Sequence, residues 1–193
     1  MIPRVTSLLA WSVDARLRNA PLTPVTTPED MGDLIAFYRD RLAAFRPPWF
    51  DRLSSTDQAR IDGLITAVLL VDGWLDAAAD RQAGHAMRLP ADELAQLGVT
   101  EAHWQEQRVD FAFRRFNERF AGRIRGVLQG AAPLGKPWLA GWRYRLTIVR
   151  VEQILRERQV DPSLWFQTET ARSPIAKATA AIRIAWRVIT GRG

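Results

Sequence analysis

Residues 55–83 read as one long helix that is apolar on nearly every side, and this feature constrains the fold more than any other. On a helical wheel, Ile65 and Leu69 lie on one side, whereas Leu70 and Trp74 lie on the opposite side. A helix with apolar residues all round is stable only when other elements cover it on every side. The sequence therefore predicts a helical bundle with this segment in its interior.

The rest of the chain shows helical spacing of apolar residues and no strand-like alternation. Helix start signals occur at Thr27 with Pro28 and at Ser54 with Asp57. The expected helices cover an N-terminal segment, then Pro28 to the Pro47-Pro48 pair, Ser55 to residue 83, Ala91 to Gly98, Thr100 to Gly130, Pro137 to Asp161, and Pro174 onward. Inward stripes are predicted at Phe113, Phe116, Phe120, Ile124 and Leu128, and at Leu139, Trp142, Leu146 and Val149. The prediction is one all-α domain over residues 1–193.

Composition excludes several kinds of site. The chain has no cysteine and only two histidines, His85 and His103, so a disulfide framework and a cysteine-bound zinc are ruled out. All but two of its 27 basic residues are arginines, whose planar fork suits phosphate and carboxylate groups. These arginines are scattered along the chain, so we expect no nucleic-acid binding, although a net charge of +6 suits contact with an acidic membrane surface.

No run of eighteen apolar residues occurs, so no membrane-spanning helix is expected. Ser12 and Asp14 interrupt the apolar stretch near the N-terminus, which therefore reads as a helix of the mature protein and not as a signal peptide. We expect a cytoplasmic protein.

Three aspartates, Asp72, Asp76 and Asp80, recur once per turn along the apolar helix. They continue the side that carries Ile65 and Leu69, so they point toward the interior, where an unpaired carboxylate is costly. Arginines, metal ions or both must therefore meet them. Carboxylates four residues apart lie about 5–6 Å from each other, which lets them hold a hydrated Mg2+ together with phosphate oxygens. Exposed or arginine-paired structural acids are the alternative.

The residues after the aspartates follow a distinctive order: Gly84, the pair Leu89-Pro90, and the acidic stretch "ADELAQLG", which ends at Gly98. With Asp76 and Asp80, this order resembles the second aspartate motif, D-x-x-x-D, of the squalene and phytoene synthase family of head-to-head isoprenyl diphosphate synthases. Trp74 and the closing "AIRIAWRVI" are most similar to the hydroxysqualene synthase branch of hopanoid biosynthesis. The similarity extends more weakly over residues 30–190.

The resemblance implies a bundle of the isoprenoid-synthase type that condenses two farnesyl diphosphates through presqualene diphosphate, in squalene, hopanoid or carotenoid biosynthesis. It implies that Asp76 and Asp80 bind Mg2+, which neutralises the diphosphate as the C–O bond ionises. Contacts to the prenyl diphosphate are then expected from Asp72, Trp74, Arg81, Gly84, His85 and Arg88.

The chain departs from the family on its N-terminal side, where it is shorter and lacks the first aspartate motif, so it corresponds to the C-terminal two thirds of such a bundle. Asp30 and Asp33 lie too near the start of their helix to replace that motif. His85 replaces an arginine that is usual after the glycine, and Arg81 or Arg88 is expected to take over its phosphate contact.

Three interpretations stay open. The chain is a fragment, or it pairs with a second polypeptide as a homo- or hetero-oligomer, or it is a non-catalytic member of the family that serves as a binding or assembly subunit. The last interpretation predicts an exposed apolar surface where the missing helices would pack.

Overall fold

The computed structural model describes residues 24, 26–135 and 142–166, and every regular element within these ranges is a helix. The α-helices are α1 (Met31–Arg39), α2 (Ser55–Gln82), α3 (Ala91–Gln96), α4 (Glu101–Gln105), α5 (Phe111–Ala131) and α6 (Trp142–Val160). Short 3-10 helices are η3 (Leu42–Phe45), η4 (Phe50–Arg52), η5 (Ala132–Gly135) and η6 (Pro162–Trp165). The all-α prediction is confirmed for this part of the chain.

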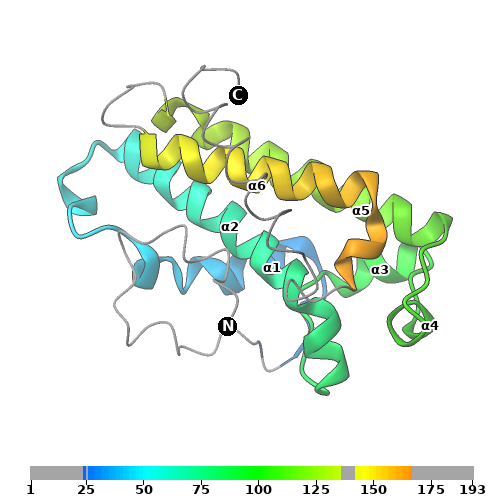
Figure 1. Ribbon diagram of the computed structural model, residues 1–193. Helices are drawn as coiled ribbons and strands as arrows, with labels where there is room; N and C mark the ends of the chain where they lie inside the picture. Colours follow the sequence, from blue (N-terminus) through cyan, green and yellow to red (C-terminus); the bar gives the residue numbers. More distant parts are fainter. Residues whose placement is uncertain (1–23, 25, 136–141, 167–193) are drawn as a thin grey trace.

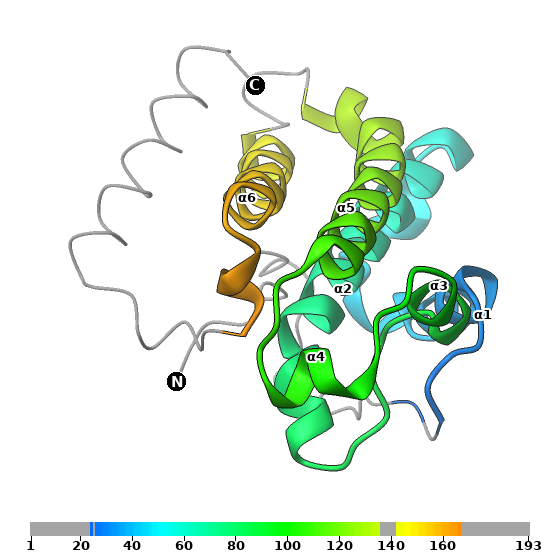
Figure 2. The same ribbon diagram turned by 90° about the vertical axis from the view of Figure 1, so that its right-hand side faces the viewer.

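The long helix α2 is the centre of the arrangement. The helices α5 and α6 run along one side of it, and α1 lies on the other side (Figure 1). A view turned by 90° shows α5 and α6 next to each other, with α1 and α3 together on the far side of α2 (Figure 2). Ala67 to Val71 are five consecutive residues that are fully buried, as expected for a helix covered all round.

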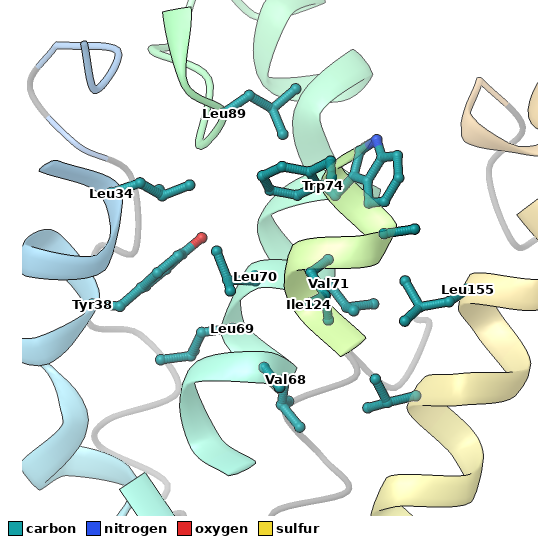
Figure 3. Close-up of a cluster of buried hydrophobic side chains, with 14 of the residues drawn as sticks. Leu34, Tyr38, Val68, Leu69, Leu70, Val71, Trp74, Leu89, Ile124 and Leu155 are labelled. Carbon is teal, nitrogen blue, oxygen red and sulfur yellow. The ribbon is translucent and has the colours of Figure 1, made fainter. Parts of the chain in front are cut away.

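One hydrophobic core joins these helices. Figure 3 shows Leu34 and Tyr38 of α1 facing α2 from one side, and Ile124 of α5 and Leu155 of α6 facing it from the other. The inward stripe predicted for α5 is confirmed, since all of its members are buried: Phe113, Phe116, Phe120, Ile124 and Leu128. The core thus fixes the central part of α2, with Asp72, inside the bundle.

The predicted start of the first described helix is wrong. The helix α1 begins at Met31, and the side chain of Asp30 caps it by accepting a hydrogen bond from the Asp33 N–H at 2.9 Å. The Thr27 hydroxyl instead accepts a hydrogen bond from the N–H of Met87, so Thr27 ties this segment to the chain after α2. The helix also ends early, at Arg39, and the chain continues as 3-10 turns before the prolines.

The single helix predicted from Thr100 to Gly130 is also wrong, because it is divided into α4 and α5. Gln107 has a φ of 53°, in the left-handed region, which breaks the helix. Asp110 then starts α5, since its side chain accepts a hydrogen bond from the Phe113 N–H at 3.1 Å. The aspartate three residues before the phenylalanine stripe was the available signal for this boundary.

Other boundaries match the predictions. Ser54 caps α2 by accepting a hydrogen bond from the Asp57 N–H, Gly98 follows α3 with a φ of 77°, and α6 ends before Asp161. The helices expected at the N-terminus and from Pro174 lie outside the described residues, as do Pro137 and Leu139. None of the described helices combines the length and the apolar character that crossing a membrane requires.

Candidate functional site

Arg88 places its guanidinium group among the three aspartates of α2. Its Nη2 lies 2.6 Å from Oδ2 of Asp76 and 3.4 Å from Oδ2 of Asp80. Its Nη1 lies 3.4 Å from Oδ2 of Asp72. The side chains of Arg88 and Asp72 are each only 3% exposed, whereas that of Asp80 is 14% and that of Asp76 35% exposed. The prediction that a cation meets these aspartates is confirmed, and the cation is an arginine of the same chain.

The end of α2 explains how Arg88 reaches the helix that it follows. Gly84 has a φ of 72°, a left-handed conformation that favours glycine. The Gly84 N–H donates to the Arg81 carbonyl at 3.1 Å, and the His85 N–H donates to the Asp80 carbonyl at 2.8 Å. This pair of bonds is the Schellman motif, which ends a helix and reverses the chain. Gly84 therefore has a structural role in bringing Arg88 back onto α2.

Gly73 makes room for two other members of the cluster. A Cβ atom at this position would collide with the hydroxyl oxygen of Tyr38 and would lie 2.8 Å from Cβ of Arg88. Figure 3 shows Tyr38 reaching from α1 toward α2, and its side chain is fully buried. Neither Tyr38 nor Gly73 was predicted as a site residue. The signal in the sequence was a glycine inside an otherwise continuous helix, which commonly marks a close approach of another segment.

Burial and charge oppose each other in this cluster. Burial raises the pKa of the Asp80 carboxyl group, and this effect outweighs the attraction of Arg88. Burial also raises the pKa of Tyr38 far above its usual value, so the hydroxyl group keeps its proton. For Arg88, burial alone would lower the pKa, but the charges of the aspartates raise it, so the guanidinium stays charged. Three carboxylates thus share one guanidinium, which leaves an excess of negative charge when all are ionised.

In the structure, Arg88 lies at the aspartates to which the family resemblance assigns Mg2+. Magnesium requires carboxylate oxygens that face the ion. Here one oxygen each of Asp72, Asp76 and Asp80 faces Arg88. In residues 26–135 and 142–166, no three histidine, aspartate or glutamate side chains form a group suited to hold a metal ion. As arranged, the three acids and Arg88 form an internal ion-pair cluster.

Trp74 does not join this cluster. Its ring stacks on that of Trp165 of η6, with centroids 3.6 Å apart and an angle of 13° between the planes. The rings of Phe116 and Phe120 meet it edge-on, with centroids at 6.2 and 4.9 Å. Trp74 is 1% exposed and belongs to the packing between α2, α5 and η6.

The two remaining predicted contacts are on the surface. The guanidinium of Arg81 pairs with the carboxylate of Glu101 at the start of α4, and both side chains are about two-fifths exposed. His85 is exposed and contributes its backbone N–H to the end of α2. The structure therefore joins Asp72, Asp76, Asp80 and Arg88 of the predicted set by ion pairs. Trp74, Arg81 and Gly84 make other contacts, and His85 acts on Asp80 through its charge.

Comparison with known proteins adds no assignment, since no family model, no curated protein and no solved structure matches the chain. The site is therefore defined by its geometry: an arginine and three carboxylates held between α2 and the chain that follows it, with a buried tyrosine beside them.

Proposed function

We propose that this chain is a non-catalytic relative of the squalene and phytoene synthases that serves as a binding or assembly subunit. The observation that supports this proposal is the 2.6 Å contact between Arg88 and Asp76, at the centre of a cluster that includes Asp72 and Asp80. A cation of the chain itself pairs with all three aspartates, so a metal ion is not needed to bring positive charge to them.

The cost of opening this cluster favours the proposal. A Mg2+ ion between Asp76 and Asp80 would lie beside the guanidinium of Arg88, and the two cations would repel each other. Moving Arg88 away would leave a side chain that is 3% exposed without its counterions. Breaking a buried ion pair in this way typically costs about 3–5 kcal/mol. The binding of Mg2+ and diphosphate would have to supply this free energy in addition to the free energy that binding itself requires.

Calorimetric titration with an unreactive farnesyl diphosphate analogue, with and without Mg2+, tests the proposal. We expect no Mg2+-dependent binding up to millimolar ligand. Binding at micromolar ligand that requires Mg2+ and is lost in both Asp76→Asn and Asp80→Asn would overturn it. Asp33→Asn is the matched control, because Asp33 is an exposed aspartate on another helix.

Light scattering coupled to size-exclusion chromatography tests the assembly role, for which a dimer or larger species is expected. The exposed large apolar side chains within residues 26–135 and 142–166 are Ile35, Trp49, Phe111 and Val160, each on a separate segment. The broad apolar surface expected for missing helices is therefore not found among these residues. A monomer at all concentrations would argue against self-assembly and leave a second polypeptide as the partner.

The excess of negative charge in the cluster supports a second candidate function, which is Mg2+-dependent binding of farnesyl or presqualene diphosphate in prenyltransferase chemistry. In this case a partner chain would supply the first aspartate motif that this chain lacks. Asp76 keeps 35% of its side chain exposed, so it is the carboxylate most accessible to an incoming ion. Arg88→Met tests this function, because it removes the competing cation. A gain of Mg2+-dependent ligand binding in Arg88→Met, absent in Arg60→Met, would favour the second candidate over the first.

A further inference from the structure

The start of α5 carries the most exposed aromatic side chain among the described residues. Phe111, the first residue of the helix, is 74% exposed, whereas the next most exposed aromatic residue, Trp49, is 39% exposed. The phenylalanines that follow on α5 are all fully buried. Phe111 therefore leaves a large apolar ring in contact with water and contributes little to the core.

Most of the positive charge of α5 is paired within the bundle. The helix has five arginines and a single acidic residue, Glu118. Three of these arginines form ion pairs with neighbouring helices: Arg119 and Arg123 with Glu93 of α3, and Arg125 with Glu152 of α6.

The other two arginines lie beside the exposed ring. Neither Arg114 nor Arg115 forms an ion pair with a carboxylate in the part of the chain that the structure describes, and both are exposed. They follow Phe111 by three and four residues, so they flank it on the surface of the helix. The guanidinium carbon of Arg115 lies 5.6 Å from the centre of the Phe111 ring. These three side chains are called the Phe111 patch.

Charge complementarity indicates an anionic partner for this patch. The first turn of α5 has no acidic residue, although the positive end of a helix favours one there. The arginines add further positive charge near that end. Their planar guanidinium groups suit phosphate oxygens, and an apolar ring between them gains free energy when it leaves water.

We propose that the Phe111 patch docks the protein on the surface of an anionic lipid membrane. The ring enters the boundary between headgroups and acyl chains, and the guanidinium groups of Arg114 and Arg115 bind lipid phosphates. Apolar area favours a membrane over a protein partner, because one aromatic side chain buries about 150–250 Å². A specific protein interface buries about 800 Å² on each partner. This docking does not depend on the aspartate cluster.

Flotation of the full chain with vesicles at low ionic strength tests the proposal. One set of vesicles contains phosphatidylcholine alone, and the other contains equal parts of phosphatidylcholine and phosphatidylglycerol. We expect binding to the anionic vesicles only. Arg114→Gln and Arg115→Gln should each lower the partition coefficient about fivefold, and Phe111→Ser should lower it about tenfold. Glu118→Gln removes the acid one turn further on and should raise it about fivefold.

Matched variants separate this patch from the net charge of the protein. Arg39→Gln and Arg52→Gln remove the same charge at exposed positions on α1 and η4, and they should change the partition coefficient less than twofold. Val160→Ser is the control for the ring, because Val160 is 85% exposed on another helix. Circular dichroism should show that every variant keeps the helical content of the wild type.

Three results would overturn the proposal. The first is a wild type that does not float with anionic vesicles. The second is an equal loss in the patch variants and in their controls, which would mean that net charge alone drives binding. The third is a wild-type oligomer that Phe111→Ser converts to a monomer in light scattering, which would make the patch a contact between protein chains.

Discussion

The guanidinium of Arg88 lies 2.6 Å from the carboxylate of Asp76, twelve residues earlier in the chain, and both belong to one cluster with Asp72 and Asp80. The chain returns after α2 with its own cation, and this cation pairs with all three acids of the stripe. This relationship decides which substitutions in the cluster the fold tolerates, and it gives the first prediction.

Replacing Arg88 with methionine should lower the free energy of unfolding by about 3–5 kcal/mol, because it leaves a buried carboxylate group without its cation. Urea unfolding followed by circular dichroism measures this loss. Arg60→Met is the control: Arg60 pairs with Asp57, but both side chains are more than one-third exposed, so the loss should be below about 1 kcal/mol. A loss for Arg88→Met as small as that of the control would contradict the central role of this ion pair.

Gly73→Ala should destabilise the protein by about 1–3 kcal/mol, since the added methyl group meets the Tyr38 hydroxyl and the Arg88 side chain. Gly126→Ala on α5 is the matched control. An added Cβ there has nothing within 4 Å, so alanine should stabilise the helix by about 0.5–1 kcal/mol.

The Gly73 prediction has a second check. Tyr38→Phe removes the hydroxyl group that the new methyl would meet, so it should relieve part of the cost of Gly73→Ala in the double variant. Equal losses for Gly73→Ala with and without the hydroxyl would show that Tyr38 is not the group that limits the space.

Much of this fold follows from patterns that are local in the sequence. Three local patterns predict where helices α2 and α5 lie: residues 55–83 are apolar on nearly every side, Ser54 caps α2, and the phenylalanines of α5 keep a helical spacing. Each pattern depends only on residues within a few turns of each other. The division between α4 and α5 was missed, since the apolar spacing runs through it while a left-handed Gln107 and the Asp110 cap interrupt the backbone. The apolar spacing predicted one continuous helix, whereas the Asp110 cap marked a new helix start, and the structure follows the cap.

The candidate site was predictable only in part. The helical wheel predicts that the aspartates point inward and need a cation, but it does not identify the cation, because Arg88 depends on how the chain turns at Gly84. Tyr38 could not be predicted either, since it approaches from α1 through the space left by Gly73. Contacts between segments distant in sequence require the tertiary arrangement.

Asp76→Asn and Asp80→Asn should have different effects at neutral pH. Asp76 makes the shortest contact to Arg88 and is partly exposed, so its replacement should cost about 1–2 kcal/mol. Burial raises the pKa of Asp80, so its charged form is unfavourable in the folded state, and Asp80→Asn should be tolerated better at pH 7.

The raised pKa of Asp80 also predicts how folding stability depends on pH. A carboxyl group whose pKa is higher in the folded state binds its proton more tightly there, so the wild type gains stability as pH falls through that pKa toward the unfolded value of about 3.9. Asp80→Asn lacks this gain. Its stability relative to the wild type should therefore be most favourable near pH 7 and should decline as the pH approaches 4, as measured by urea unfolding at each pH. A relative stability that is constant across this range would contradict the raised pKa.

Trp74 and Trp165 should be coupled as core residues, because their rings stack with centroids 3.6 Å apart and both are nearly fully buried. Trp74→Ala should cost about 3–5 kcal/mol through the cavity that it creates. Trp165→Ala should have a similar effect, and the double variant should lose less than the sum by about 0.5–1.5 kcal/mol, the worth of an aromatic pair. Tryptophan emission is a poor readout with eight tryptophans in the chain, so urea unfolding followed by circular dichroism should be used. If Trp74→Ala left stability unchanged, the packing role would be wrong and the substrate-contact role expected from the family resemblance would regain its support.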